Sequence, residues 1–292
     1  MKPARFKYLR PASLEEALAA LGEHADDAKL IAGGQSLVPM LNFRLLAPAV
    51  LIDINRLPGL DTATETPGGG LAIGALTRHQ TLEWSDAVKR RFPVLNAAVK
   101  HIGHLAIRNR GTTGGSLSHA DPTAELPLMS VLLDGSLTLS SARGSRTIAA
   151  RDFFVGTLAT ALEPHEMLTR VDLPALPDGC GWAFEEFARR CGDYAIAAVG
   201  AILRVANGRV TDARIAIAGG GGGPLRAPQA EKSLIGRAID DAALRDAMQA
   251  VDGEIEPVND LQVSAEYRRH LIGVLTQRAL RAAWQRASGA KA

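Results

Sequence analysis

Hydrophobic and polar positions alternate in blocks along the chain, and the blocks predict a mixture of helices and strands. Leucines recur on one face of the segment 14–21, which follows a capping box formed by Ser13 and Glu16. Short apolar runs at 28–32 and 50–54 predict two buried strands. The first fifty-odd residues are therefore expected to form a small α/β unit.

The pattern changes after Leu57, where a turn-rich stretch precedes a new set of elements. The run 71–77 predicts a strand that leads into a helix, with Thr77 and Gln80 as a second capping box and an interruption near Pro93. Two further strands are expected at 136–141 and 166–174.

A cluster of proline and glycine at 173–181 marks the best domain boundary. Three antiparallel strands are expected beyond it, and Asn207-Gly208 is a strong hairpin signal between the second and the third. The glycine run that starts at Gly219 predicts a flexible connection. A long amphipathic helix is expected from about Ser264, with Tyr267, Leu271 and Val274 along one side.

Composition narrows the function classes. With 47% hydrophobic and 22% charged residues the chain is globular, and 33 basic against 31 acidic residues give a net charge of +2, too small a bias for nucleic-acid binding. No apolar stretch is long enough to span a membrane and the N-terminus lacks the apolar core of a signal peptide, so a cytoplasmic location is expected. Cys180 and Cys191 are the only cysteines; two thiolates cannot hold an iron–sulfur cluster, which needs four ligands.

Two Gly-Gly steps, at 33–34 and 114–115, carry the candidate chemistry. Glycine lacks a Cβ and accepts positive φ, so backbone amides can approach and surround a bulky anion. The steps themselves contain no Lys or Arg. This suits a diphosphate that is only bound better than a phosphate that is transferred in a reaction. Either step alone is more often a structural turn, and spacing does not show that the two meet. Neutral donors stand next to them: Gln35, Ser36, Thr112, Thr113 and Ser116.

Three motifs together resemble one family. AGGQSLVPMLNFRL, TTGGSLSHADPTAELP and ARRCGDYA, in this order, are similar to the FAD-carrying medium subunit of molybdenum hydroxylases, the group that includes xanthine dehydrogenase and carbon monoxide dehydrogenase. The likeness extends to about residue 285. It implies an α+β (α/β) fold: a two-lobed, PCMH-type FAD-binding domain at 1–176, with lobes at about 1–56 and 57–176. A C-terminal domain at 177–288 is expected to hold a three-stranded antiparallel sheet and a helical bundle.

The resemblance also implies the site. A first flavin loop would span 29–36 and a second 112–116, both on the diphosphate, with Glu125 near the sugar portion. Ile102 and Leu168 would flank the cofactor, and Asp193 and Tyr194 would lie near the isoalloxazine ring. The complete set of expected cofactor-binding residues is Lys29, Leu30, Ile31, Ala32, Gly33, Gly34, Gln35, Ser36, Ile102, Thr112, Thr113, Gly114, Gly115, Ser116, Glu125, Leu168, Asp193 and Tyr194.

The function implied is electron transfer. FAD would receive electrons from [2Fe–2S] clusters of a small partner subunit, which takes them from the molybdenum cofactor of a large one, and would pass them to an external acceptor. A dimer of heterotrimers is expected, and no residue of this chain is expected to be catalytic or to bind metal. Two departures matter: Glu185 stands where some relatives have a basic residue, and the extra features of NAD-using relatives are missing.

Two other functions stay open. A self-contained flavoenzyme with its own small substrate would need a proton donor or base over the flavin, and no convincing residue is found. A non-redox module that binds another phosphorylated ligand is the second. His119 with Asp121 is more simply a capped turn before Pro122 than an acid–base dyad, and His101 with His104 lacks a well-spaced carboxylate for a metal site.

Overall fold

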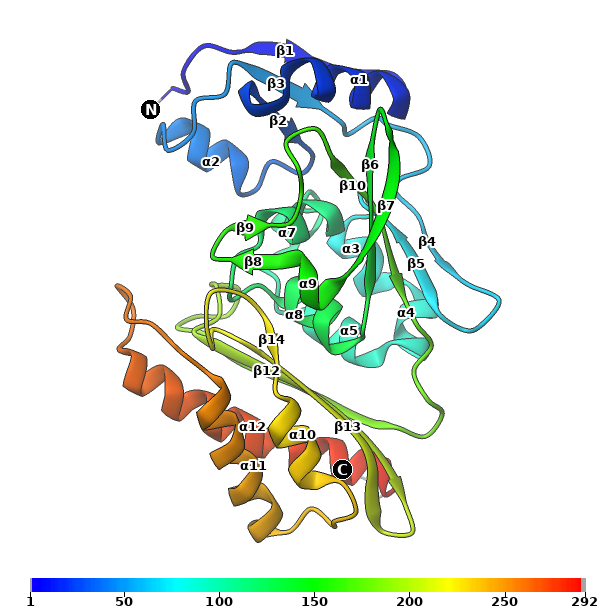
Figure 1. The fold of residues 1–292 in the computed structure, drawn as a ribbon, viewed down its shortest axis with the longest axis vertical. Helices are drawn as coiled ribbons and strands as arrows, with labels where there is room; N and C mark the ends of the chain where they lie inside the picture. The colour runs from blue at the N-terminus through cyan, green and yellow to red at the C-terminus, as the bar shows by residue number, and fades with distance from the viewer. Residues whose placement is uncertain (1, 290–292) are drawn as a thin grey trace.

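The computed structural model describes residues 2–289 as three regions stacked along the long axis (Figure 1). The N-terminal lobe is a parallel three-stranded sheet in the order β1-β3-β2. Its apolar runs form β2 and β3 as expected, while β1 is a mainly exposed strand that the hydrophobic pattern did not reveal. Its elements are β1 (Lys7–Leu9), α1 (Leu14–His24), a 3-10 turn (Ala25–Asp27), β2 (Ala28–Ile31), α2 (Leu37–Asn42) and β3 (Val50–Asp53).

The second lobe contains an antiparallel five-stranded sheet, β4-β5-β10-β6-β7, with helices packed beside it (Figure 1). Its strands are β4 (Ala63–Glu65), β5 (Leu71–Gly74), β6 (Ser136–Ser141), β7 (Gly144–Ala149) and β10 (Met167–Leu173), with a small hairpin of β8 (Phe154–Gly156) and β9 (Ala159–Thr160). Its helices are α3 (His79–Trp84), α4 (Asp86–Arg91), α5 (Pro93–Val99), α6 (Leu105–Arg108), α7 (Thr113–His119), α8 (Glu125–Leu132) and α9 (Ala150–Phe153).

The helix starts were partly predicted. Ser13 caps α1 and accepts a hydrogen bond from the Glu16 amide, and Pro93 begins α5 after a break, both as expected. The capping box at Thr77 and Gln80 is wrong. Thr77 is buried and donates its hydroxyl to the Thr62 carbonyl at 2.8 Å, so α3 begins only at His79 and has no side-chain cap.

The C-terminal region covers one face of its sheet with helices. The three expected strands and the Asn207-Gly208 hairpin are present, but the sheet has a fourth, two-residue strand within the glycine-rich segment, so the three-stranded expectation is corrected. Gly219 in that segment is buried and donates its amide to Pro122 at 3.0 Å. The elements are β11 (Gly181–Phe187), β12 (Ala197–Ala206), β13 (Arg209–Ala218), β14 (Leu225–Arg226), α10 (Pro228–Leu234), α11 (Asp241–Glu254) and α12 (Ala265–Ala287).

The buried side of α12 matches the one that the sequence indicated only at Leu271, which is buried. Tyr267 is 44% exposed, and the face that packs on the sheet contains Leu275, Leu280 and the buried Arg268. Arg268 is compatible with this core because its guanidinium donates to the Ile196 carbonyl and pairs with Asp260. A charged residue on the core face therefore hid the true periodicity.

One sheet joins the two larger regions. The side chains of β12 and β13 pack on the helices α10–α12 from one face and on α8 from the other. Gly200 of β12 allows this contact, since a Cβ there would lie 2.6 Å from Leu132 of α8. The C-terminal region thus completes the core of the second lobe.

Candidate functional site

The first glycine loop leaves the carboxyl end of β2 and enters α2. Gly34 has φ +73°, a conformation that side chains rarely adopt, and Gln35 folds back to donate to the Gly33 carbonyl at 3.0 Å. Within residues 2–289, the amides of Gly33, Gly34, Gln35 and Ser36 have no hydrogen-bond acceptor. These four consecutive donors are free to surround an anion, and the carboxyl ends of parallel strands are where ligands of α/β units bind.

The second glycine segment is the start of a helix and not a turn, which corrects the sequence-based interpretation. Thr112 is the N-cap of α7 and its Oγ1 accepts from the Gly115 amide at 3.2 Å. The amides of Thr113 and Gly114 already donate to Thr77 at 2.9 Å and Ala75 at 2.8 Å. This segment can offer an anion its hydroxyl groups, above all Ser116, but not those amides.

The two segments are in direct contact. A Cβ on Gly33 would lie 2.3 Å from the Arg110 carbonyl oxygen, just before the second segment, and Arg110 Nε donates to the Gly33 carbonyl at 3.4 Å. Glycine is required at position 33 because the other backbone occupies the place of a side chain. The expectation that two remote segments converge is confirmed.

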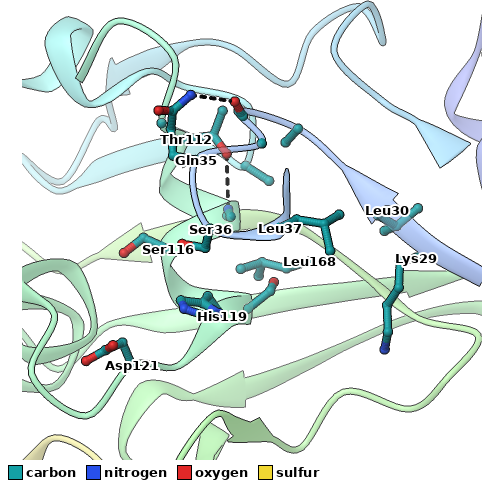
Figure 2. A pocket seen from close by; sticks show the side chains of 18 of the residues that line it. Lys29, Leu30, Gln35, Ser36, Leu37, Thr112, Ser116, His119, Asp121 and Leu168 are labelled. Carbon is teal, nitrogen blue, oxygen red and sulfur yellow. Dashed lines mark hydrogen bonds between the residues drawn. The ribbon is translucent and has the colours of Figure 1, made fainter. Parts of the chain in front are cut away.

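A cavity of about 840 Å³ opens where the segments meet (Figure 2). Its volume is near the upper end of the usual range for ligand pockets, so it can hold a large ligand. All but two of the eighteen residues expected to bind the cofactor line it. Ile31 does not, and Thr113 does not because its hydroxyl donates to the Thr77 carbonyl at 3.2 Å.

The N-terminal lobe gives the cavity an apolar wall that the motifs did not reveal. Leu21, Ala28 and Ile54 line the cavity and also belong to the core of that lobe, together with Leu76 and Met167 from the second lobe. A slot between apolar side chains suits a flat aromatic ring. In Figure 2, Lys29 and Leu30 lie on one side of the view, His119 lies near the middle, and Asp121 lies on the opposite side.

A buried carboxyl group faces the cavity from the first turn of α8. Burial, together with the negative charge of the neighbouring Glu186, raises the pKa of Glu125 to about 8. Glu186 is itself buried, and its Oε1 lies 3.5 Å from Nδ1 of the half-exposed His101. The hydrogen bond with Glu186 raises the pKa of His101. At neutral pH Glu125 is mainly protonated and can donate a hydrogen bond into the cavity.

The C-terminal region supplies the cavity's remaining wall. Asp193 and Tyr194 lie between β11 and β12 and reach the cavity, and Tyr194 is 54% exposed. Partial burial raises the pKa of its phenol, and the nearby hydroxyl of Ser36 in the first loop opposes this shift. The third motif therefore joins the other two at one site. Glu185, the residue that departs from some relatives, does not line the cavity.

The other candidates have local roles. Asp121 Oδ1 accepts from the amide and the hydroxyl of Thr123, which confirms the capped turn, although His119 and Asp121 also line the cavity. Among the described residues, no group of three or more His, Cys, Asp and Glu is arranged to hold a metal ion. Nor does the described part of the chain contain a helix long and apolar enough to cross a membrane.

Sequence reasoning missed three polar residues behind the loops: Asn55, Arg78 and His79. Burial lowers the pKa of His79 to about 4, so the imidazole is neutral at physiological pH, and His79 also lines the cavity. The bonds that these side chains make with the loops span 23 to 33 residues of sequence. Only the tertiary structure could reveal them.

Comparison with known proteins agrees with this geometry. The protein-family model for the FAD binding domain in molybdopterin dehydrogenase matches residues 4–176. The family model for the CO dehydrogenase flavoprotein C-terminal domain matches residues 182–283. The 6-hydroxypseudooxynicotine dehydrogenase complex subunit alpha of Paenarthrobacter nicotinovorans is 42% identical over all of this chain and 98% of its own length. The carbon monoxide dehydrogenase medium chain of Hydrogenophaga pseudoflava is 39% identical over 98% of this chain and 99% of its own.

A solved structure has the same fold. Carbon monoxide dehydrogenase from Hydrogenophaga pseudoflava, in a form that lacks the Mo-pyranopterin moiety of the molybdenum cofactor, superposes with a TM-score of 0.95 at 40% identity, covering 98% of this chain and 99% of that one. The fold and the site define an FAD-dependent oxidoreductase subunit. The chain belongs to the family of FAD-binding medium subunits of molybdenum hydroxylases.

Proposed function

We propose that this chain holds FAD in the cavity between its glycine segments and transfers electrons within a heteromeric molybdenum-containing hydroxylase or dehydrogenase. Electrons enter from the [2Fe–2S] clusters of a small partner subunit, fed by the molybdenum cofactor of a large one, and leave to an external acceptor. The assembly is a dimer of heterotrimers in the cytoplasm. The observation that carries the proposal is the direct contact of the two glycine segments at one large cavity.

The residues of the cavity fit FAD. The free amides of Gly33 to Ser36 and the hydroxyl of Ser116 would hold the diphosphate, which is not transferred and so needs hydrogen-bond donors but no metal or arginine clamp. The apolar wall around Leu21 and Ile54 excludes water from an aromatic ring, and protonated Glu125 donates to an acceptor of the bound molecule. Asp193 and Tyr194, which line the cavity, would lie next to the isoalloxazine ring. When bound, FAD supplies the capacity to accept, store and release an electron pair.

Division of labour with partner chains is supported by the sequence and by the relatives. The two cysteines of the chain cannot form an iron–sulfur site, which needs four ligands. Relatives of 42% and 39% identity are named for 6-hydroxypseudooxynicotine and carbon monoxide, two very different molecules. Substrate choice therefore belongs to another chain. We also propose a boundary at residue 176 between a flavin-holding domain at 1–176 and a C-terminal domain at 177–288 that completes the cavity, supported by the family models that match residues 4–176 and 182–283.

Purification from the native host tests the proposal. We expect a yellow complex with absorption bands near ~370 and ~450 nm, typical of flavins, and a large and a small partner chain that travel with this one. A colourless, fully active homo-oligomer would contradict it. If the isolated chain reduced its own flavin with a small substrate, the self-contained flavoenzyme would be the correct alternative.

A further inference from the structure

Three polar side chains connect the two glycine segments, two from behind the cavity and one, His79, from its lining, and we propose that they are positioning residues for the cofactor's diphosphate. Asn55, Arg78 and His79, called the clamp below, hold the segments in the one relative position in which both reach the same ligand. This inference rests on the proposed function, because it assumes that the segments bind the diphosphate.

Asn55 attaches the clamp to the first loop. It follows β3, and its Nδ2 donates to the Ala32 carbonyl at 2.7 Å, at the entry of the loop. Asp53 orients this amide by accepting from the same nitrogen at 2.7 Å. Asn55 Oδ1 remains as an acceptor and is bound by Nη2 of Arg78 at 2.8 Å.

Arg78 links Asn55 to the second segment. Its Nη1 donates to the carbonyl of Arg110, the same carbonyl that occupies the place of a Cβ on Gly33. One guanidinium thus fixes both sides of the closest contact between the segments. Its planar fork makes the two bonds at once, which the ammonium group of lysine cannot reproduce.

His79 fixes the next two peptide groups. Its backbone amide donates to the Gly111 carbonyl at 3.1 Å, and its Nε2 lies 3.0 Å from the Thr112 carbonyl oxygen. A carbonyl only accepts, so Nε2 carries the proton and the neutral ring acts as a donor. Gly111 leaves room for the ring, since a Cβ there would lie 2.7 Å from Nδ1.

The clamp therefore holds three consecutive carbonyls, those of Arg110, Gly111 and Thr112, and the entry of the first loop. None of its bonds is made to the isoalloxazine side of the site, where Ile102, Asp193 and Tyr194 lie. Loss of the clamp should weaken recognition of the diphosphate and leave recognition of the flavin ring unchanged. Loss of folding would weaken both.

The test measures three ligands on the full-length chain after removal of flavin: FAD, ADP as a diphosphate probe and riboflavin as a ring probe. For Arg78→Met we expect FAD and ADP to bind about tenfold to a hundredfold more weakly, the usual effect of losing hydrogen bonds to a charged group, with riboflavin unchanged. Arg78→Lys should not restore binding. His79→Leu should weaken FAD and ADP, and His79→Gln should restore them because Gln Nε2 replaces the imidazole donor.

The controls distinguish failure of the clamp from failure of the proposed FAD site. Arg90→Met removes an exposed arginine that pairs with Glu65 away from the cavity and should change nothing. Unchanged FAD and ADP binding in folded Arg78→Met, or an equal loss of all three ligands, overturns the clamp. If Gly34→Val also keeps FAD at wild-type stoichiometry, then the proposed site is wrong, whereas loss in Gly34→Val alone refutes only the clamp.

Discussion

The two glycine segments have the same sequence signature but different structures. In the first, Gly34 takes a left-handed conformation and the neighbouring amides stay free. In the second, Gly114 and Gly115 lie in the first turn of α7, and their amides donate to Ala75 and Thr112. A Gly-Gly step followed by hydroxyl residues therefore indicates that another group packs closely against the backbone there. It does not indicate whether that group is a ligand or another part of the protein.

The difference assigns separate tasks to the segments. In the proposed site the first loop supplies backbone donors to the diphosphate, so its glycines are needed for conformation and for contact with Arg110. The second segment supplies hydroxyl groups from a helix that is fixed against β5, so Gly114 is needed for packing.

The largest change in the free energy of unfolding is expected on acidification. Burial keeps His79 neutral with a pKa of about 4, below its usual value, so the unfolded chain binds more protons than the folded one between pH ~6.5 and ~4. The contribution of neutral His79 to stability is complete above pH ~6.5. It is lost as the pH falls, by up to about 1.4 kcal/mol per pH unit.

Urea unfolding of the apoprotein at several pH values checks this. His79→Gln should show a smaller loss of unfolding free energy between pH 7 and pH 5 than the wild type. Glu125, with a pKa of about 8, acts in the opposite direction, so the informative quantity is the difference between the two proteins. Parallel pH profiles would show that His79 does not cause this loss of stability in acid.

Next in size is Gly33→Ala. Its methyl group would meet the Arg110 carbonyl at 2.3 Å, which forces the segments apart at a cost of about 1–3 kcal/mol, equivalent to about fivefold to 150-fold weaker FAD binding. Flavin titration of the apoprotein measures it. Gly22→Ala, in an open position on α1, is the matched control; FAD affinity equal in both variants would mean that contact between the segments does not shape the site.

Gly114→Ala should act on stability more than on binding. Its Cβ would lie 2.6 Å from the Ala75 side chain and 2.8 Å from the Ala75 carbonyl oxygen. Because β5 must shift, we expect the free energy of unfolding to fall by about 1–2 kcal/mol, near the middle of the range for overpacking. A thermal midpoint equal to that of the wild type would contradict the packing role.

Gly115→Ala should have the smallest effect. Only the Thr112 hydroxyl lies within 3 Å of the added Cβ, at 2.7 Å, and this hydroxyl can rotate. Loss of part of the cap, about 1 kcal/mol, is offset by the higher helix propensity of alanine, also about 1 kcal/mol. Stability and FAD content close to wild type would support this, while a loss as large as that of Gly33→Ala would show that the two segments bind the anion alike.

Local patterns predicted most of the fold. The apolar runs placed β2, β3, β5 and β10, and the proline–glycine cluster lies in the connection between β10 and β11. Elements without such a pattern were missed: β1 is largely exposed, and β14 has two residues. The capping box at Thr77 failed because burial directs the hydroxyl to Thr62, a partner fifteen residues away.

The part of the site that lies in short sequence motifs could be predicted. The loops, Glu125 and Tyr194 lie in short stretches with a distinctive sequence, and all of them reach the cavity. Asn55, Arg78 and His79 are isolated polar residues in ordinary surroundings, and their importance depends on partners brought near by folding. Whether backbone amides are free or already bonded is likewise a property of the tertiary structure.

The cavity's final wall comes late in the chain, and this sets an order of events during synthesis. Both glycine segments have left the ribosome long before the stretch with Asp193 and Tyr194 is made, and that stretch is held by a sheet whose β13 and β14 follow it. Nascent protein up to residue 176 contains both loops but lacks Tyr194 and the strands that complete the core of the second lobe. Firm capture of the prosthetic group therefore belongs to the closing stage of biosynthesis, when the last third of the polypeptide has folded.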